Sequence, residues 1–278
     1  MGMQDKDEKK VDLETPEWDI SDLYSGAEDP RIKQDLADLK VRAEEFEKKY
    51  RGRIKDTSIS AVFLAEALSE SESIYQDLSR TSLFVGLLFA SDMNDEKANA
   101  LNSAFEDKAS QISNHLIFFR TELFSFSEEK VDDLSAHPKL ANFKHFLKVL
   151  MADKPFHLSE AEERILLEKN TTSQGALGEL FEKVPTKTEF TVKLSGKTKK
   201  LGLSEILHLL YSPSRETRKE AARSITAGFK KSGWLYVDLM NHLINDKRVE
   251  DRLRKHNYPE EARHLANEIS KEAVEALV

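Results

Sequence analysis

The side chains that could form a metal site are a histidine and two glutamates near the end of the chain. Glu260, His264 and Glu268 would lie on one face of a helix, where two carboxylates around an imidazole could hold a metal or tune a proton donor. The same spacing also gives solvated ion pairs, with Arg263 beside them. We favour the solvated pairs, because a catalytic zinc also needs outer groups that fix its ligands.

The eight histidines do not form the helix motif of zinc proteases. In that motif, His-Glu-x-x-His, two imidazoles one turn apart bind the metal and the glutamate is the base for its water. No histidine of this chain is followed by glutamate. There is no cysteine to act as a thiolate, and seryl catalysis lacks its usual Gly-x-Ser-x-Gly turn. The sequence therefore predicts no catalytic, cofactor-binding or metal-binding residue in this chain.

Three weaker patterns resemble sites for phosphates or ions. Gly196-Lys197-Thr198 matches the end of a phosphate-binding loop, but Thr191 replaces its first glycine and both flanks are typical of strands. Residues 92–97 resemble a calcium loop without its glycine, so we interpret them as a helix start capped by Asp92. A basic cluster could hold a carboxylate or phosphate, although nearby acids favour a solvated face. Its members are Arg248, Arg252, Arg254, Lys255 and His256.

The composition indicates a mostly helical protein of one large or two smaller domains. Its 278 residues are 33% charged and 39% hydrophobic, with only 10 Gly and 7 Pro to interrupt helices. The net charge of −8 argues against a broad nucleic-acid surface. No apolar run reaches the roughly 20 residues that cross a bilayer, and the N-terminus lacks the apolar core of a signal peptide. We therefore expect a cytoplasmic protein that binds neither nucleic acid nor membrane.

The spacing of apolar residues predicts the first helices. A stripe from Ile32 to Tyr50 at intervals of three and four predicts one long helix. Residues 59–89 predict a second helical region, broken near 69–73. Its last part, 83–89, is apolar on all sides, so we expect it to be deeply buried.

A near-heptad series of apolar residues from Leu101 to Leu123 predicts another long helix beside an antiparallel neighbour. Further on, Ser159 with Glu162 predicts a capping box at a helix start. Alternating residues on either side of a Ser-Gly pair predict a β-hairpin at about 189–201.

Signals for helix starts continue after the hairpin. Ser212 with Pro213 predicts the start of a helix that buries one face, including Ala221 and Ala222. A last helix is predicted after Ser270, which can act as its cap. The fold class is thus mainly α, a multi-helix two-lobe array with one small β-hairpin.

Several motifs, in this order, resemble the oligoendopeptidase F family of zinc metallopeptidases. They are Trp18–Tyr24, Leu158–Glu163, Glu168–Leu177, the hairpin leading into Leu201–Ser204, Tyr211–Ala222 and Arg252–Arg263. The likeness covers nearly the whole chain, and its order makes it specific. It implies a helical peptidase whose two lobes enclose a deep cleft, and which cuts short oligopeptides rather than folded proteins.

The resemblance also implies what this chain lacks. In the family, the zinc-binding helix lies downstream of the part that matches, and this sequence ends before it. No zinc ligand or catalytic glutamate is therefore carried over, and zinc is expected only in the intact protein. We expect an N-terminal part that forms cleft wall or lid and is inactive alone, with a missing C-terminal lobe and short peptides as partners. The alternative is a non-catalytic helical module that binds peptides or proteins.

The resemblance and the apolar patterns together suggest a division of the chain. Residues 1–15 are expected to be a disordered tail, and 16–125 an N-terminal helical lobe. Residues 126–202 would be an oligopeptidase F-type helical segment with the hairpin, and 203–278 the truncated start of the catalytic lobe.

Overall fold

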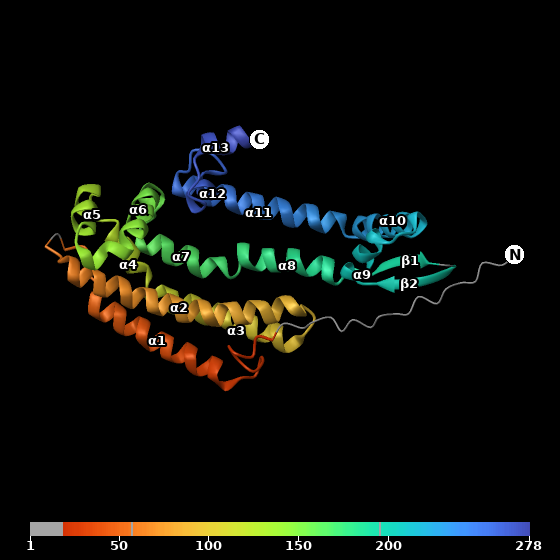
Figure 1. Cartoon of the computed structure of the whole chain (residues 1–278), viewed down its shortest axis with the longest axis horizontal. Coiled ribbons are helices and arrows are strands. Elements are labelled where there is room, and N and C mark those ends of the chain that lie inside the picture. Colours follow the sequence, from red (N-terminus) through yellow and green to blue (C-terminus); the bar gives the residue numbers. More distant parts are fainter. Residues whose placement is uncertain (1–18, 57, 195) are drawn as a thin grey trace.

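A computed structural model describes residues 19–56, 58–194 and 196–278. These residues form helices almost throughout, with one two-stranded antiparallel sheet, so the predicted mainly helical fold with a single hairpin is confirmed. In Figure 1, α1 to α3 lie along one side, α7 and α8 run end to end through the middle, and α10 and α11 lie opposite. The predicted tail at 1–15 falls outside the described residues.

The helices follow one another with short connections. Their bounds are α1 Pro30–Tyr50, α2 Ala61–Ser91, α3 Glu96–Asn114, α4 Ile117–Leu123, α5 Glu128–Ser135, α6 Lys144–Asp153, α7 Glu160–Asn170, α8 Gln174–Thr186, α9 Leu203–His208, α10 Arg215–Lys231, α11 Gly233–Arg254, α12 Glu261–Ala266 and α13 Lys271–Leu277. Short 3-10 helices occur at Pro138–Phe143, Lys154–Phe156 and Leu209–Tyr211. None of the helices in this part of the chain is long and apolar enough to cross a membrane.

Helix α1 shows how local sequence sets an element. Its buried residues are the predicted stripe from Ile32 to Tyr50. Asp29 accepts a hydrogen bond from the Arg31 backbone N–H, which satisfies a free donor at the helix start. Pro30 has no N–H to satisfy at the first position. The stripe then packs against α2 and α3.

Buried apolar side chains between Tyr24 and Leu150 form one continuous core, which we call the bundle core. Phe46 lies at its centre, with ring centroids 4.8 Å from Tyr50, 5.7 Å from Phe118 and 5.1 Å from Phe119. Fully buried aromatic rings contribute much of the free energy of such a core. The helices from α1 to α6 therefore hold together through apolar packing.

One buried carboxylate closes a loop onto this bundle. Glu122 of α4 is 8% exposed and accepts backbone N–H groups of Gly52, Ile54 and Lys55, at 2.6, 3.1 and 3.3 Å. The loop after α1 would otherwise leave these donors without partners near the core. Its glycine, at φ 80°, adopts a conformation that other residues rarely reach.

Helix α2 corrects two predictions. It continues without a break through 69–73, because serines without Gly or Pro cost a helix little, and α1 packs along it. Its C-terminal part is not buried on all sides. Leu83 and Leu87 are 56% and 43% exposed, whereas Phe84 and Val85 are buried, since α3 covers only one face.

The predicted long helix from Leu101 to Leu123 is two helices. Helix α3 ends at Asn114, and α4 begins at Ile117. In the turn between them, the backbone N–H groups of His115 and Leu116 donate to Ile112 and Ser113, and α4 then buries both Phe118 and Phe119. The cap of α3 is Asp95, which accepts from the Lys97 N–H, and not Asp92.

The hairpin is as predicted, with β1 Phe190–Leu194 paired to β2 Lys197–Leu201. Phe190 and Val192 form a small second core with Ile206 and Ala221. Gly228 of α10 lies so close to Phe190 that a Cβ there would come within 2.5 Å of the ring.

The start of α10 differs from its prediction. Ser214 caps this helix by accepting from the Thr217 N–H, so the helix begins at Arg215 and neither Ser212 nor Pro213 opens it. Ala222 is exposed, because the hairpin covers the Ala221 side of α10.

Candidate functional site

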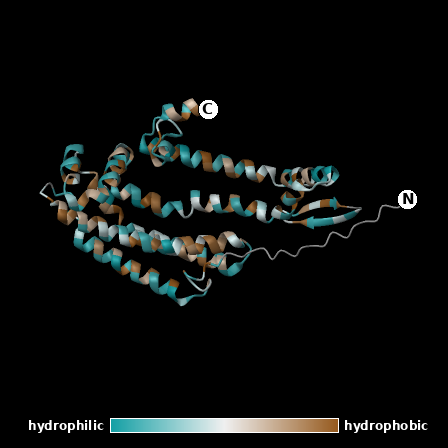
Figure 2. Cartoon of the chain, in the orientation of Figure 1, coloured by the Kyte–Doolittle hydropathy of each residue, from teal (hydrophilic) through white to brown (hydrophobic). Residues whose placement is uncertain are grey.

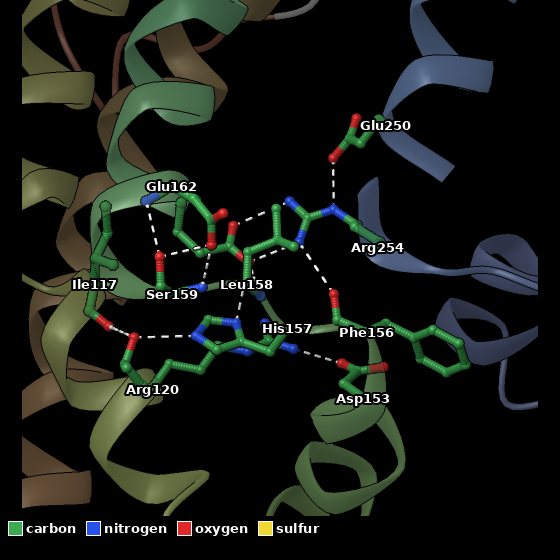
Figure 3. Close-up of polar contacts among 12 residues, drawn as sticks. Ile117, Arg120, Asp153, Phe156, His157, Leu158, Ser159, Glu162, Glu250 and Arg254 are labelled. Carbon is green, nitrogen blue, oxygen red and sulfur yellow. Dashed lines mark hydrogen bonds and ion pairs between the residues drawn. The ribbon is translucent and has the colours of Figure 1, made fainter. Parts of the chain in front are cut away.

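Two segments far apart in sequence meet where α11 ends beside the start of α7 (Figure 3). The guanidinium of Arg254 donates to both carboxylate oxygens of Glu163, with N···O distances of 2.6 and 3.0 Å. Its Nε donates to Glu250 at 2.7 Å. The side chains of Arg254 and Glu163 are only 21% and 15% exposed. This paired, bidentate contact tethers α11 to α7.

His157 extends the same cluster toward α4. Its Nδ1 lies 3.1 Å from the Glu163 carboxylate, and its Nε2 lies 3.0 Å from the Thr121 hydroxyl. Burial acts to raise the pKa of Glu163. Hydrogen bonds from His157, Arg254 and a backbone N–H outweigh burial and hold this pKa well below its usual range. Glu163 is therefore an anion fixed from three directions.

The local sequence explains why Glu163 points this way. The predicted capping box is present, with the Ser159 hydroxyl accepting from the Glu162 N–H and the Glu162 carboxylate accepting from the Ser159 N–H. The chain before α7 is thereby held against the first helical turn. The Leu158 N–H donates to Glu163 at 3.0 Å as part of the same turn.

The order hydroxyl, imidazole, carboxylate resembles that of an activated nucleophile. Three observations oppose that role. The Thr121 hydroxyl lies 3.2 Å from the Ile117 carbonyl, the usual hydrogen bond of a threonine within a helix. Glu163 is shared with Arg254. Thr121 does not line the pocket beside the cluster. We interpret the cluster as a support that orients His157.

A pocket of about 520 Å³, here called the junction pocket, lies beside this cluster. Its walls come from α2, α3, α4, α6, α7 and the α11–α12 region. Much of its lining is apolar, and includes Leu116, Phe156, Leu167, Ala262, Leu265 and Ala266. Its charged groups are paired, because Arg120 donates to Asp153 at 2.5 Å and Arg254 binds Glu163.

Two more pockets continue from it along α7 and α8. The middle pocket, of about 440 Å³, shares Glu163, Leu167 and Arg254 with the junction pocket. The acidic pocket, of about 670 Å³, shares Asn170 and Gln174 with the middle pocket. Pockets of this size are in the range that binds small ligands and peptide side chains.

The acidic pocket is lined by four carboxylates. Glu106 and Asp107 come from α3, and Glu179 and Glu182 from α8. Burial raises the pKa of Glu106, and the nearby Glu179 charge raises it further. Lys183 forms an ion pair with Glu179. This end of the series therefore carries an excess of negative charge.

The residues with metal-ligand spacing do not come together. Helix α12 covers only Glu261–Ala266, so Glu260 and Glu268 lie outside it. Glu268 pairs instead with His145 of α6 at 2.9 Å, and the His264 ring lies 3.2 Å from the Tyr258 hydroxyl. Across the described ranges, no three His, Cys, Asp or Glu side chains form a group that could hold a metal. The described residues thus do not fit a zinc site.

The basic cluster near the C-terminus is not one solvated face. Arg254 and His256 turn inward, and their side chains are 21% and 5% exposed. The His256 ring stacks on Phe156 at 4.3 Å. Sequence reasoning could identify the Glu250 partner of Arg254 from its four-residue spacing, but not Glu163, which lies 91 residues away.

The weaker patterns have ordinary structural roles. Lys197 and Thr198 lie in β2, and no helix follows Gly196 directly, so the context of a phosphate-binding loop is absent. Ser195 falls outside the described residues. Asp92 accepts from the Asn94 N–H in the turn before α3.

The geometry defines a helical chain with a series of pockets along its central helices, and comparisons with known proteins show which proteins it resembles. A family model described as Oligopeptidase F matches residues 122–190. Group B oligopeptidase PepB of Streptococcus agalactiae is 26% identical over 94% of this chain. An oligoendopeptidase F homolog of Borreliella burgdorferi is 22% identical over 80% of it.

Comparison with solved structures shows the same kind of fold. Oligoendopeptidase-F from Enterococcus faecium superposes with a TM-score of 0.77 over 87% of the chain, at 16% identity. A putative peptidase from Chlamydophila abortus gives a TM-score of 0.61 over 94% of it. The resemblance to oligoendopeptidase F that the motifs predict is therefore confirmed. The chain spans 38% of the Borreliella relative and 43% of PepB.

Proposed function

We propose that this chain is the N-terminal part of a zinc-dependent oligoendopeptidase that hydrolyses short peptides in the cytoplasm. Its helices would form wall and lid of the substrate cleft. The zinc ion and the base for its water would be held by residues outside this chain. Alone, the chain is expected to bind no catalytic zinc and to cleave no peptide.

One observation carries the proposal. The match to relatives named as oligopeptidases extends over 80% and 94% of this chain but over only 38% and 43% of theirs. The His-Glu-x-x-His motif is missing from the sequence. Both facts are expected if the hydrolytic centre belongs to the part of such enzymes that this chain does not cover.

The purified chain tests the proposal directly. Zinc content is measured by mass spectrometry, and cleavage of a quenched fluorescent peptide is followed with and without a chelator. We expect neither zinc nor cleavage from the 278-residue chain. Sequencing the gene beyond Val278 should reveal His-Glu-x-x-His, and the longer product should hydrolyse the peptide until chelator is added. Stoichiometric zinc with chelator-sensitive cleavage by the 278-residue chain would contradict the proposal, as would a stop codon after Val278.

The second candidate is a non-catalytic module that binds peptides. The three adjoining pockets along α7 and α8 favour it, since they provide a continuous binding surface. A native stop codon after Val278 together with peptide binding would support this function over the first.

A further inference from the structure

The junction, middle and acidic pockets form one series along α7 and α8. Neighbouring pockets share lining residues, and neither helix has a buried residue, because open space flanks both. The two helices run end to end (Figure 1). From Glu163 to Glu182 they extend roughly 28 Å at 1.5 Å per residue. An extended peptide of about eight residues has this length.

The junction pocket suits an uncharged, apolar group. Leucine and phenylalanine side chains line it, and the alanines of α12 leave it unfilled. Because Arg120 and Arg254 are each paired with a carboxylate, an anionic ligand would have to displace an existing partner. At the edge, the Tyr75 side chain is 47% exposed and can hydrogen-bond to a peptide backbone.

The acidic pocket at the other end suits a cation. Of its four carboxylates, Glu179 has an ion-pair partner in Lys183. No ion pair within the described chain involves Glu106 or Glu182. An ammonium group placed here would be attracted by several negative charges and would relieve the repulsion between Glu106 and Glu179.

We propose that the junction, middle and acidic pockets together form a groove that binds an extended peptide of about eight residues. An ammonium group of the peptide would lie at the acidic pocket, and an apolar side chain in the junction pocket. The ammonium group is the peptide's amino terminus or a lysine side chain. The inference rests on the proposed function and deepens it, because it states which part of a bound peptide lies at each end of the groove. It requires no metal and no hydrolysis.

Calorimetric titration of the whole chain with eight-residue peptides tests this arrangement. The reference peptide has a free amino terminus, alanines and serines in the middle, and leucine at its other end. Replacing the leucine by serine should weaken binding about tenfold, from the burial of one apolar side chain. Acetylating the amino terminus should weaken it about threefold, as expected for an exposed charge pair. A lysine at the first position of the acetylated peptide restores binding if the acidic pocket accepts any ammonium group. It does not restore binding if the pocket recognises only the peptide's amino terminus.

Matched variants locate the two ends. Ala262→Phe fills the junction pocket and should abolish the preference for leucine, whereas Ala227→Phe, at an exposed alanine of α10, should not. Glu106→Gln should weaken the free-amino peptide about threefold and leave the acetylated peptide unchanged. Glu45→Gln removes the same charge from an exposed position on α1 outside the three pockets.

The outcomes separate this inference from the proposed function. Circular dichroism and thermal unfolding first establish that each variant is folded. Equal affinity for all peptides, no measurable binding, or leucine preference retained in Ala262→Phe would contradict the proposed peptide groove without affecting the case for a zinc enzyme. If peptides bind in the expected direction but the longer product lacks zinc and activity, the groove is supported and the proposed enzymatic function is contradicted.

Discussion

The helices before residue 157 and those after it are held together by different forces. The bundle of α1 to α6 encloses a continuous apolar core, whereas α7, α8, α12 and α13 have no buried residue. Large apolar side chains of α11 lie on the surface, with Trp234 68% and Ile244 58% exposed, and Figure 2 shows hydrophobic segments along this helix. The later part depends on ion pairs at the junction and on a small core around the hairpin.

This difference indicates where the molecule is rigid and where it can respond. Apolar packing is insensitive to salt and to moderate changes of pH, whereas a half-buried ion pair depends on the ionisation of both partners. The junction and acidic pockets lie along the boundary between the two parts, whereas the middle pocket is lined by the later part alone. The bundle therefore provides a fixed wall, and the α11–α12 side a wall whose position can be altered by changing a few charges.

The largest effect is expected in the bundle core. Phe46→Ala should lower the free energy of unfolding by about 4 kcal/mol, because it empties a site surrounded by three aromatic rings. Urea unfolding of the chain measures this loss. Val41→Ala on the same helix is the control, since Val41 is 53% exposed and should change stability little. Equal losses for both variants would show that α1 packs differently.

A smaller, local effect is expected at the junction. Arg254→Met leaves the Glu163 charge without its main partner, and should lower the free energy of opening α11–α12 by about 2 kcal/mol. Hydrogen exchange measures this opening, and exchange in the bundle should stay unchanged. Arg223→Met breaks a more exposed pair with Glu220, in which Arg223 is 63% exposed, and serves as the control. Loss of protection in α1 to α3 as well would contradict the view that the two parts are stabilised separately.

The smallest effect is a pH dependence confined to the junction. The pKa of Glu163 is lowered in the folded protein from an ordinary value of 4.5. Its contribution is therefore complete above about pH 4.5 and is lost as the pH falls toward the lower folded value. Protection of α11–α12 should decrease over this range. His157 and Arg254 contact the Glu163 carboxylate, whereas Glu250 contacts Arg254 on its other side.

Glu163→Gln provides the test of that assignment. The variant should be less protected than the parent at pH 6 and should lose most of the pH dependence at the junction. An unchanged profile would mean that other carboxyl groups, such as Glu250, control the opening of this region.

Sequence predicts the local features of this fold well. The stripe of α1, the capping box of α7 and the hairpin each depend on residues within a few positions of one another. The predicted break in α2 and the continuous helix from Leu101 to Leu123 are wrong because packing against neighbouring helices decides both. Propensity differences of a few tenths of a kcal/mol per residue are too small to oppose such packing.

The junction could not be predicted from spacing alone. Its central contact joins Glu163 to Arg254, and the loop contact of Glu122 joins positions 67 to 70 residues apart. Charged residues are frequent on every helix, so sequence offers many equivalent pairs and no means of choosing among them. The four-residue spacing of Glu260, His264 and Glu268 predicted a shared face that the short α12 does not provide.

The bundle core has a consequence for how the protein is made. Its buried residues all lie between Tyr24 and Leu150, so all of them emerge from the ribosome before the residues of α7 do. Domains of this kind fold as units while synthesis continues, at roughly 5–20 residues per second. The first six helices can thus be complete while the rest of the chain is still being translated. The central helices and α11 would then assemble on a finished surface, instead of having to find their places in a collapsing chain.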